Sequence, residues 1–357
     1  MTEEATPRPN YDDVVRVRAD QAIAPRPSAR PPRIEAVARL AGVSPITVSR
    51  ALRQPEKLTE ETRRKVLEAV AHTGYESNPH ARALRSGRST LVAAFISNIL
   101  SQPFGLAIQG LAAELEPEGY ELMIGQTSYS YAKEVAMIRS LRSLRPAAVM
   151  FTGVIELEDN RQALRELSIP VVETWAYPRD PIDMLVGFSN VDAGAMAAEH
   201  LAARGYRRLG FIGRAGGRGA LRLRGFRAAA ERLGVTIARE VTVPEVIGIA
   251  DGRAALRRLV EDGEQVEAVF CANDLLATGA LIEARARGLS IPGDLAILGF
   301  GDNDAAAEIA PGLTTISIDA YSIGRRAGAL LRERLAGVTP QRPQQAIDLA
   351  LILRGSI

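Results

Sequence analysis

The chain has 357 residues, of which 46% are hydrophobic and 24% charged, and its formal net charge is +2. This length exceeds one typical domain, and the composition is that of a globular protein rather than of a disordered one. No apolar run approaches the roughly 20 residues that span a bilayer, and no secretory signal is visible, so we expect a cytoplasmic protein without a membrane partner. The single cysteine and the three histidines lack the spacing of a metal site, and we expect no cofactor.

Charge is unevenly distributed along the chain. Residues 30–90 hold twelve Lys and Arg against six Asp and Glu, whereas residues 91–357 hold 28 against 31. A basic segment joined to a slightly acidic remainder is typical of a protein with a small nucleic-acid-binding module, because Lys and Arg neutralise phosphates. A chance fluctuation would give the same counts, so charge alone does not decide the matter.

The N-terminal segment, residues 1–32, is rich in Pro, Arg and Ala and lacks hydrophobic periodicity. This composition predicts a disordered arm, because it offers too little apolar surface to bury. Its arginines could contact DNA phosphates, but a plain flexible tail is the simpler interpretation.

Residues 33–78, the head, predict three short helices. Apolar residues recur at i, i+3, i+4 and i+7 from Ile34, and Gly42 ends this first helix as a residue that tolerates positive φ. Ser44 can cap the second helix, and the proline that follows suits its first turn. A third helix is expected after Thr59, with acidic residues in its first turn.

The second of these helices has the pattern of a DNA-reading helix. Val48 and Leu52 lie four residues apart and are expected to pack inward, which leaves the following residues on the outer side: Pro45, Ile46, Ser49, Arg50 and Arg53. An arginine on a helix in the major groove donates two hydrogen bonds to guanine, and hydroxyls such as those of Thr47 and Ser49 bind phosphates. A surface helix with a solvated arginine is the alternative.

Beyond residue 89 the pattern changes to alternating strands and helices. Apolar runs that predict buried strands occur at 91–97, 121–125, 147–151, 170–174, 208–213, 266–272 and 295–300. Uninterrupted apolar strands between helical segments indicate parallel sheets covered on both faces. Two such series predict two doubly wound lobes, with a ligand where the carboxyl ends of the two sheets face one another.

Three motifs in the head carry a family resemblance. The segments A-G-V-S-P-I-T-V-S-R at 41–50, T-R-R-K-V at 62–66 and G-Y-E-S-N at 74–78 are similar to the head of the lactose-repressor (LacI/GalR) family. This resemblance implies a homodimer on palindromic operator DNA, with Pro45, Ile46 and Arg50 at base-reading positions. It also places Ser44, Thr47, Ser49 and Arg53 among the DNA contacts. Arg33 departs from the family, which usually has a Ser or Thr cap there.

The next segment, N-P-H-A-R-A-L-R at 78–85, resembles the hinge of the same family, and we assign residues 79–90 to the hinge and linker. The resemblance implies a short helix that orders on the operator, with Leu84 as a wedge in the minor groove and Ala81 beside it. It also implies backbone contacts from Asn78, Arg82 and Arg85. A charged linker with an incidental leucine is the alternative.

The resemblance continues through residues 91–357, the body, and implies a periplasmic-binding-protein-like fold that closes on a small effector. Lobe 1 is then formed by 91–188 with 319–345, and lobe 2 by 189–318 with 346–357. The segment L-R-L-R-G-F at 221–226 places Arg222 in the cleft, and C-A-N-D at 271–274 places Asn273 there, with Asp274 as a brace for its loop.

Two positions of the expected cleft depart from the family. Gly301 stands where relatives have an aspartate, and Asp302 could substitute from the next position. Trp175 stands where many relatives have another aspartate, and it either stacks on the effector or is a lobe-surface aromatic. Three residues after the first strand of the body are candidate contacts in lobe 1: Ser97, Gln102 and Phe104. Loop packing and helix capping explain these three equally well.

Loss of carboxylates near a retained arginine favours an anionic ligand. The pattern V-V-E with D-M-L-V-G-F-S-N at 183–190, and the closing R-G-S-I, also resemble gluconate-operon repressors. We therefore expect a transcriptional regulator, with repression as the expected sign, whose effector is a sugar or a sugar acid such as gluconate. The alternative is a corepressor-dependent regulator of the same family.

Functions outside transcription fit the sequence less well. The glycine-rich segment 210–219 lacks G-x-G-x-x-G spacing, and neither a G-x-S-x-G elbow nor a phosphate-binding GxxxxGK[ST] loop is present. A dehydrogenase or sugar kinase is therefore disfavoured, and we expect that this protein is not an enzyme. A transport binding protein is disfavoured by the head.

Overall fold

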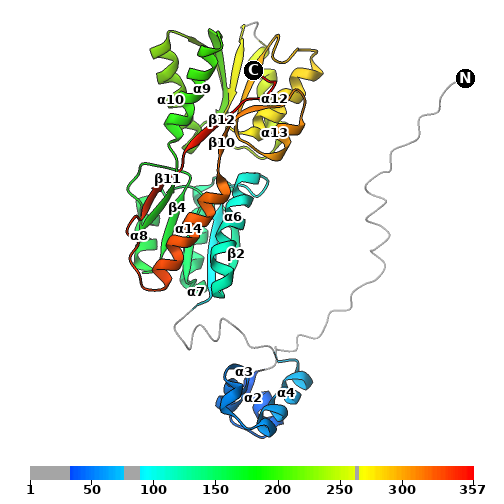
Figure 1. Cartoon of the computed structure of the whole chain (residues 1–357), viewed down its shortest axis with the longest axis vertical. Helices are drawn as coiled ribbons and strands as arrows, with labels where there is room; N and C mark the ends of the chain where they lie inside the picture. The colour runs from blue at the N-terminus through cyan, green and yellow to red at the C-terminus, as the bar shows by residue number, and fades with distance from the viewer. Residues whose placement is uncertain (1–32, 76–88, 262–264) are drawn as a thin grey trace, which may run out of the picture. The chain divides into compact units, whose positions relative to one another are not determined.

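The computed structural model describes residues 33–75, 89–261 and 265–357. The chain divides into two units, Met1–Arg82 with the head and Ala83–Ile357 with the body (Figure 1). None of the helices described is long and apolar enough to cross a membrane.

The head is a three-helix unit made of α2 (Ile34–Ala41), α3 (Pro45–Arg53) and α4 (Glu60–Thr73), with the short 3-10 turn η1 (Pro55–Lys57). Gly42 and Gly74 end α2 and α4 at φ of 66° and 61°, as the glycine positions predict. The hydroxyl of Ser44 accepts a 3.1 Å hydrogen bond from the amide of Thr47 and so caps α3. The predicted helices of the head are thus confirmed.

The core of the head is small and apolar. Its buried side chains come from all three helices: Val37, Ala38, Val48, Ala51, Val66 and Ala69. Leu52, which was expected to pack inward, is half-buried and lies against this cluster. Each fully buried valine contributes about 1.5–3 kcal/mol, so the head has few side chains with which to hold its helices in place.

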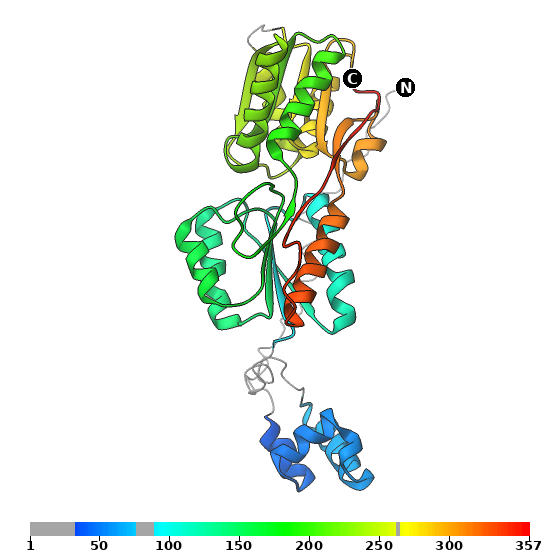
Figure 2. The ribbon, with the colours of Figure 1, turned by 60° about the vertical axis from the view of Figure 1, so that its left-hand side comes forward.

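The body consists of two lobes, each built on a six-stranded sheet (Figure 2). The sheet of lobe 1 has the order β11-β5-β4-β3-β1-β2, and its paired strands are all parallel. Its strands are β1 (Leu91–Ile96), β2 (Glu121–Gln126), β3 (Ala148–Phe151), β4 (Val171–Thr174), β5 (Met184–Gly187) and β11 (Gln344–Ala346). The helices of this lobe are α6 (Gln102–Leu115), α7 (Tyr131–Leu144), α8 (Glu158–Glu166) and α14 (Ala320–Leu335), with the short 3-10 turn η2 (Glu116–Glu118). Helices α6 and α14 lie side by side (Figure 1).

The sheet of lobe 2 has the order β12-β10-β9-β8-β6-β7, with β12 antiparallel to β10 and the other pairs parallel. Its strands are β6 (Arg208–Arg214), β7 (Thr236–Val243), β8 (Ala268–Cys271), β9 (Ala296–Gly301), β10 (Thr314–Ile318) and β12 (Leu349–Ile352). Its helices are α9 (Asn190–Ala203), α10 (Gly217–Leu233), α11 (Ile249–Val260), α12 (Asp274–Ala286) and α13 (Asp304–Glu308). The chain passes between the sheets after β5, after β10 and between β11 and β12 (Figure 2).

One predicted strand differs in its environment. Residues 121–125 were predicted to form a buried strand, but β2 lies at the edge of its sheet, and Met123 and Ile124 are exposed. Sheet order decides this, because an edge strand has one neighbouring strand instead of two. The other predicted strands are buried along most of their length.

Helices α9 and α10 approach each other unusually closely. A Cβ on Gly194 would lie 1.9 Å from the carbonyl oxygen of Arg222, and a Cβ on Gly225 would lie 1.8 Å from that of Val191. Glycine is therefore required at both positions, because any side chain would separate the two helices. This contact fixes the middle of α10 against the N-terminal part of α9.

Candidate functional site

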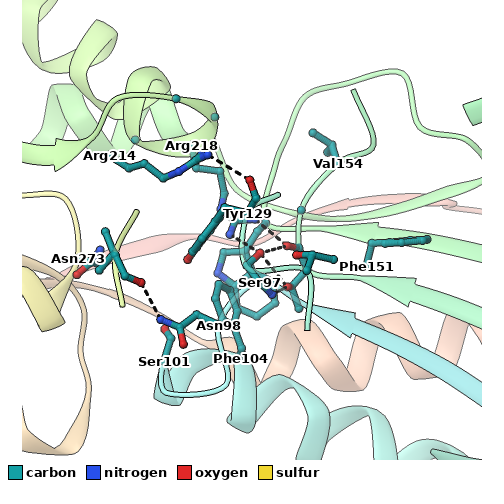
Figure 3. A pocket seen from close by; sticks show the side chains of 18 of the residues that line it. Ser97, Asn98, Ser101, Phe104, Tyr129, Phe151, Val154, Arg214, Arg218 and Asn273 are labelled. Atoms are coloured by element: carbon teal, nitrogen blue, oxygen red, sulfur yellow. Dashed lines mark hydrogen bonds between the residues drawn. The ribbon is translucent and has the colours of Figure 1, made fainter. Parts of the chain in front are cut away.

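A cavity of about 160 Å³ lies between the two lobes of the body (Figure 3). Since one water occupies roughly 10–15 Å³ of such space, the cavity has room for a small solute. Residues that follow the ends of strands from both sheets line it, among them Ser97 after β1, Thr152 after β3 and Asn273 after β8. This is the position in which doubly wound sheets bind ligands.

Arg222 is a buried cation of this cavity, with only 8% of its surface exposed. Its Nη1 donates a 2.5 Å hydrogen bond to Oδ1 of Asn190, and its guanidinium lies 4.3 Å from the ring centre of Phe300. Its Nε is buried and has no hydrogen-bond partner among the described residues. Burial, and then the charge of Arg218, lower the pKa of Arg222 to about 9. A negatively charged hydrogen-bond acceptor would pair with Nε and balance the charge of Arg222.

Arg218 lies one turn earlier on α10 and lines the same cavity (Figure 3). It donates from Nη1 to the carbonyl oxygen of Thr152 at 2.8 Å and from Nη2 to Oγ of Ser97 at 3.0 Å. Its guanidinium lies 5.4 Å from the ring centre of Phe104 and 5.7 Å from that of Tyr129. Arg218 was not predicted from the sequence, although Arg214, Arg218 and Arg222 recur every four residues. That spacing is the signal that could have found it.

Arg214 completes this arginine row at the end of β6. Its guanidinium lies 5.0 Å from the ring centre of Tyr129 and donates to the carbonyl oxygen of the same residue at 3.3 Å. It also donates to the carbonyl oxygen of Pro244 at 3.1 Å. The glycine-rich segment that follows begins α10 and lines the cavity, so it has the role of a turn at the cleft.

Lobe 1 supplies an acidic side to the cavity, which was likewise not predicted from the sequence. The hydroxyl of Tyr131 donates to Glu156, and Glu134 accepts a 2.7 Å hydrogen bond from Asn160. Burial raises the pKa of Glu134. No family motif covers these residues, and their nearness to the arginines depends on the closure of the two lobes.

The loop that carries Glu156 is held by a buried carboxylate. Glu173 on β4 accepts 2.8 Å hydrogen bonds from the amides of Ile155 and Ile182, and Arg161 lies 3.7 Å away. Burial nevertheless raises the pKa of Glu173. Glu173 therefore fixes the loop that forms this wall of the cavity, although it does not line the cavity itself.

Two of the three candidates after the first strand line the cavity. Ser97 does so while donating 2.8 Å from Oγ to the carbonyl oxygen of Thr152, and Phe104 does so from α6. Gln102 is not among the lining residues, because its Oε1 accepts a 2.7 Å hydrogen bond from the amide of Asp304 on lobe 2. The structure therefore places Gln102 in a contact between the lobes.

Trp175 lines the cavity and is only 3% exposed. Its ring packs edge-on against Phe104, with 5.0 Å between ring centres, and its carbonyl oxygen accepts a 2.9 Å hydrogen bond from Nδ2 of Asn190. The interpretation of Trp175 as a lobe-surface aromatic is therefore wrong. Burial between β4 and α6 keeps it inside the body.

Asn273 lines the cavity and caps α12, accepting a 2.9 Å hydrogen bond from the amide of Leu276. The buried Asp274 accepts hydrogen bonds from Oγ1 of Thr315 at 2.8 Å and from the amide of Asn303 at 3.0 Å. Burial raises the pKa of Asp274 to about 6. Asp274 thus braces its loop, in agreement with the sequence-based expectation.

Asp302 does not replace the missing aspartate. Its carboxylate accepts a 2.8 Å hydrogen bond from Nη2 of Arg354, and it is not among the residues that line the cavity. Gly301 does line the cavity, at φ of 131°. The turn from Gly301 into Asp302, which itself has φ of 53°, directs the carboxylate towards the C-terminal segment.

In the head, α3 presents an exposed face. Ile46 is 71% exposed, Pro45 and Arg50 are also exposed, and Thr47 and Ser49 are half-buried. Several predicted DNA contacts lie outside the described residues: Asn78, Ala81, Arg82, Leu84, Arg85 and the side chain of Arg53.

The head and the two-lobed body define a class, that of DNA-binding regulators with a ligand-binding body. Residues 33–78 match the family model of bacterial regulatory proteins of the lacI family, and residues 198–357 match that of a periplasmic binding protein-like domain. The chain is 38% identical over 308 residues to the HTH-type transcriptional regulator GntR of Pseudomonas aeruginosa, which covers 86% of this chain and 90% of the relative.

Two solved structures are similar to this chain in fold. A LacI family transcriptional regulator from Silicibacter pomeroyi is 29% identical, with a TM-score of 0.83 over 91% of this chain and 99% of that one. The transcription regulator GntR from Chromobacterium violaceum is 32% identical, with a TM-score of 0.71 over 74% of this chain and 98% of that one. The chain therefore belongs to the LacI family and is a DNA-binding transcriptional regulator, which confirms the predicted family and fold class.

Proposed function

We propose that this regulator acts in the cytoplasm as a homodimeric repressor of a palindromic operator, and that a sugar acid such as gluconate in the interlobe cavity controls its operator affinity. The observation that carries the choice of effector is Arg222, a buried guanidinium whose Nε has no partner among the described residues. Leaving a buried charged donor unpaired is costly, so an anionic acceptor is favoured there.

The balance of charge in the cavity supports a single negative charge on the effector. The described lining residues include three arginines and two glutamates: Arg214, Arg218, Arg222, Glu134 and Glu156. One positive charge is therefore uncompensated, and the raised pKa of Glu134 weakens the acidic side further. Carboxylates accept hydrogen bonds from hydroxyls, so Glu134 and Glu156 suit the polyol chain of an aldonate.

The other effector contacts in this proposal come from both lobes. Ser97, Phe104 and Trp175 supply the wall of lobe 1, and Asn273 supplies that of lobe 2. Burial of both walls around a small polar ligand is the usual design of such sites, in which a few placed polar groups fix orientation.

On DNA, we propose that α3 enters the major groove. Arg50, Pro45 and Ile46 contact base edges, and the hydroxyls of the same helix region bind phosphates. The remaining proposed contacts are Ser44, Thr47, Ser49, Arg53, Asn78, Ala81, Arg82, Leu84 and Arg85. Effector binding shifts the population between lobe arrangements that favour or oppose operator binding.

Calorimetric titration tests the effector. Gluconate and related aldonates should bind, whereas glucose and gluconamide, which carries the same polyol chain without the charge, should bind at least about tenfold more weakly, a difference of about 1.4 kcal/mol. Binding of neutral sugars only would rule out the sugar-acid proposal and leave the regulator assignment intact. The sign of regulation follows from whether the bound effector weakens or strengthens operator binding.

A further inference from the structure

Arg218 belongs to lobe 2, but its hydrogen-bond partners belong to lobe 1. Its two donor nitrogens contact the carbonyl oxygen of Thr152 and the hydroxyl of Ser97. Both of these acceptors belong to buried residues at the ends of strands in the lobe 1 sheet. Its guanidinium also lies against two aromatic rings of the same lobe, those of Phe104 and Tyr129 (Figure 3). Lobe 1 therefore surrounds the guanidinium of Arg218 with hydrogen-bond acceptors and aromatic rings.

The acceptors of Arg218 are electrically neutral. Hydrogen bonds from a guanidinium to a carbonyl and a hydroxyl are weaker than a bidentate pair with a carboxylate, which adds full charge and matches the planar fork. Glu156 acts on Arg218 only through space, and no ion pair between the two is formed in the described part of the chain. A carboxylate that enters the cavity is thus a better partner for Arg218 than the partners it has.

We propose that Arg218 is a second arginine, beside Arg222, that makes the effector site specific for an anion, by exchanging its lobe 1 acceptors for the carboxylate of the effector. This inference rests on the proposed function and names the residue and the exchange that give it selectivity. When Arg218 turns to the carboxylate, Oγ of Ser97 and the carbonyl oxygen of Thr152 keep the hydrogen bond between them, but each regains a lone pair that can accept a hydrogen bond from an effector hydroxyl. A neutral polyol offers hydroxyls but no charge, so it leaves Arg218 in place.

The exchange of partners by Arg218 also links effector binding to the contact between the two lobes. In the structure Arg218 connects lobe 2 to lobe 1, alongside the bond from Asn98 Nδ2 to the carbonyl oxygen of Val246 at 2.9 Å. The proposal therefore implies that Arg218 connects the two lobes and gives up its contacts with lobe 1 when it binds the anion. Removal of its side chain should loosen the free cleft and, separately, abolish the preference for an anion.

Trp175 offers a direct readout, because it is the only tryptophan of the chain. Its ring packs edge-on against Phe104, and the guanidinium of Arg218 lies over the same phenylalanine. Emission from Trp175 and its quenching by acrylamide therefore report on the contact that Arg218 makes with lobe 1.

The test uses the full chain and three variants. Arg218→Met removes the charge at similar volume, Arg218→Lys keeps the charge but loses the fork, and Arg224→Met is a matched control at an exposed position of the same helix. In the absence of ligand, the acrylamide quenching constant of Trp175 is measured for each. Gluconate and gluconamide are then titrated, with circular dichroism to confirm that every variant is folded.

In the ligand-free proteins, we expect the quenching constant to rise about twofold in Arg218→Met and to stay at the wild-type value in Arg224→Met. An unchanged constant in a folded Arg218→Met protein would overturn the tie between the lobes. This measurement needs no effector, so it stands even if gluconate does not bind.

In the titrations, we expect the preference of the wild type for gluconate over gluconamide to fall at least about tenfold in Arg218→Met, in part in Arg218→Lys, and not in Arg224→Met. The same preference in wild type and Arg218→Met, or equal losses in the Met and Lys variants, would overturn the role of Arg218 in charge selection. Failure of gluconate and other aldonates to bind the wild type would instead overturn the proposed effector and, with it, this role of Arg218.

Discussion

Arg222 donates a hydrogen bond of 2.5 Å from Nη1 to Oδ1 of Asn190. Asn190 lies at the start of α9 and donates from Nδ2 to the carbonyl oxygen of Trp175 in lobe 1 at 2.9 Å. One buried amide therefore orients the cleft arginine of lobe 2 and contacts the wall of lobe 1. The close glycine contact between α9 and α10 keeps the two side chains at this distance.

Replacement of Asn190 by Ala should lower both stability and effector affinity. It leaves a buried guanidinium donor and a buried carbonyl without partners, and each such loss costs about 1–3 kcal/mol. Urea unfolding should show this loss, and calorimetry should show weaker gluconate binding. Gln162→Ala, at an exposed position, is the control. A variant as stable as wild type would show that Asn190 does not hold Arg222.

Arg222→Met should separate the two activities of the protein. We expect gluconate affinity to fall by about tenfold or more, because the variant lacks the charge for the carboxylate, while operator affinity without effector stays near wild type. Arg227→Met removes an exposed arginine of the same helix that pairs with Glu240, and such a surface pair is worth only about 0–1 kcal/mol. Retained gluconate affinity in Arg222→Met would contradict the placement of the effector.

Asp274 should make stability depend on pH. Burial raises its pKa from 3.8 to about 6, so the folded state holds a proton that the unfolded state has already lost. The contribution of Asp274 therefore decreases as pH rises from about 4 to about 6 and is constant above. Urea unfolding of wild type and Asp274→Asn at pH 4.5 and 7 measures this, and the Asn variant should lose less stability over the interval. Parallel pH profiles would contradict the raised pKa.

Leu84→Ala tests the hinge inferred from the sequence. If Leu84 is a wedge in the minor groove, its truncation should weaken operator binding by roughly 1–3 kcal/mol and leave gluconate binding unchanged, because the proposed effector binds in the interlobe cavity. Fluorescence anisotropy with a labelled duplex measures the first effect and calorimetry the second. Equal operator affinity of the two proteins would refute the wedge.

The positions that sequence patterns located are those with a local cause. Gly42 and Ser44 mark helix ends because their backbone and side-chain chemistry act within a few residues. Arg222 and Asn273 were located because family motifs include them, and both line the cavity.

The positions that sequence patterns missed depend on distant parts of the chain. Arg218 binds Ser97, which is 121 residues away, and only closure of two lobes brings the two together. Asp302 was misplaced because its carboxylate pairs with Arg354, 52 residues further on, at a turn with positive φ. The exposure of β2 likewise follows from sheet order, which strand composition does not reveal.

The control of operator affinity by an anionic effector in the interlobe cavity is the centre of the proposed function. Its most direct test is fluorescence anisotropy of a palindromic duplex, selected in vitro by this protein, titrated with protein in the absence and presence of saturating gluconate. We expect gluconate to change the Kd for the operator by about 5–150-fold, the usual range of such coupling, and gluconamide at the same concentration to leave it unchanged. Identical curves with and without gluconate, or an equal change with gluconamide, would contradict the account.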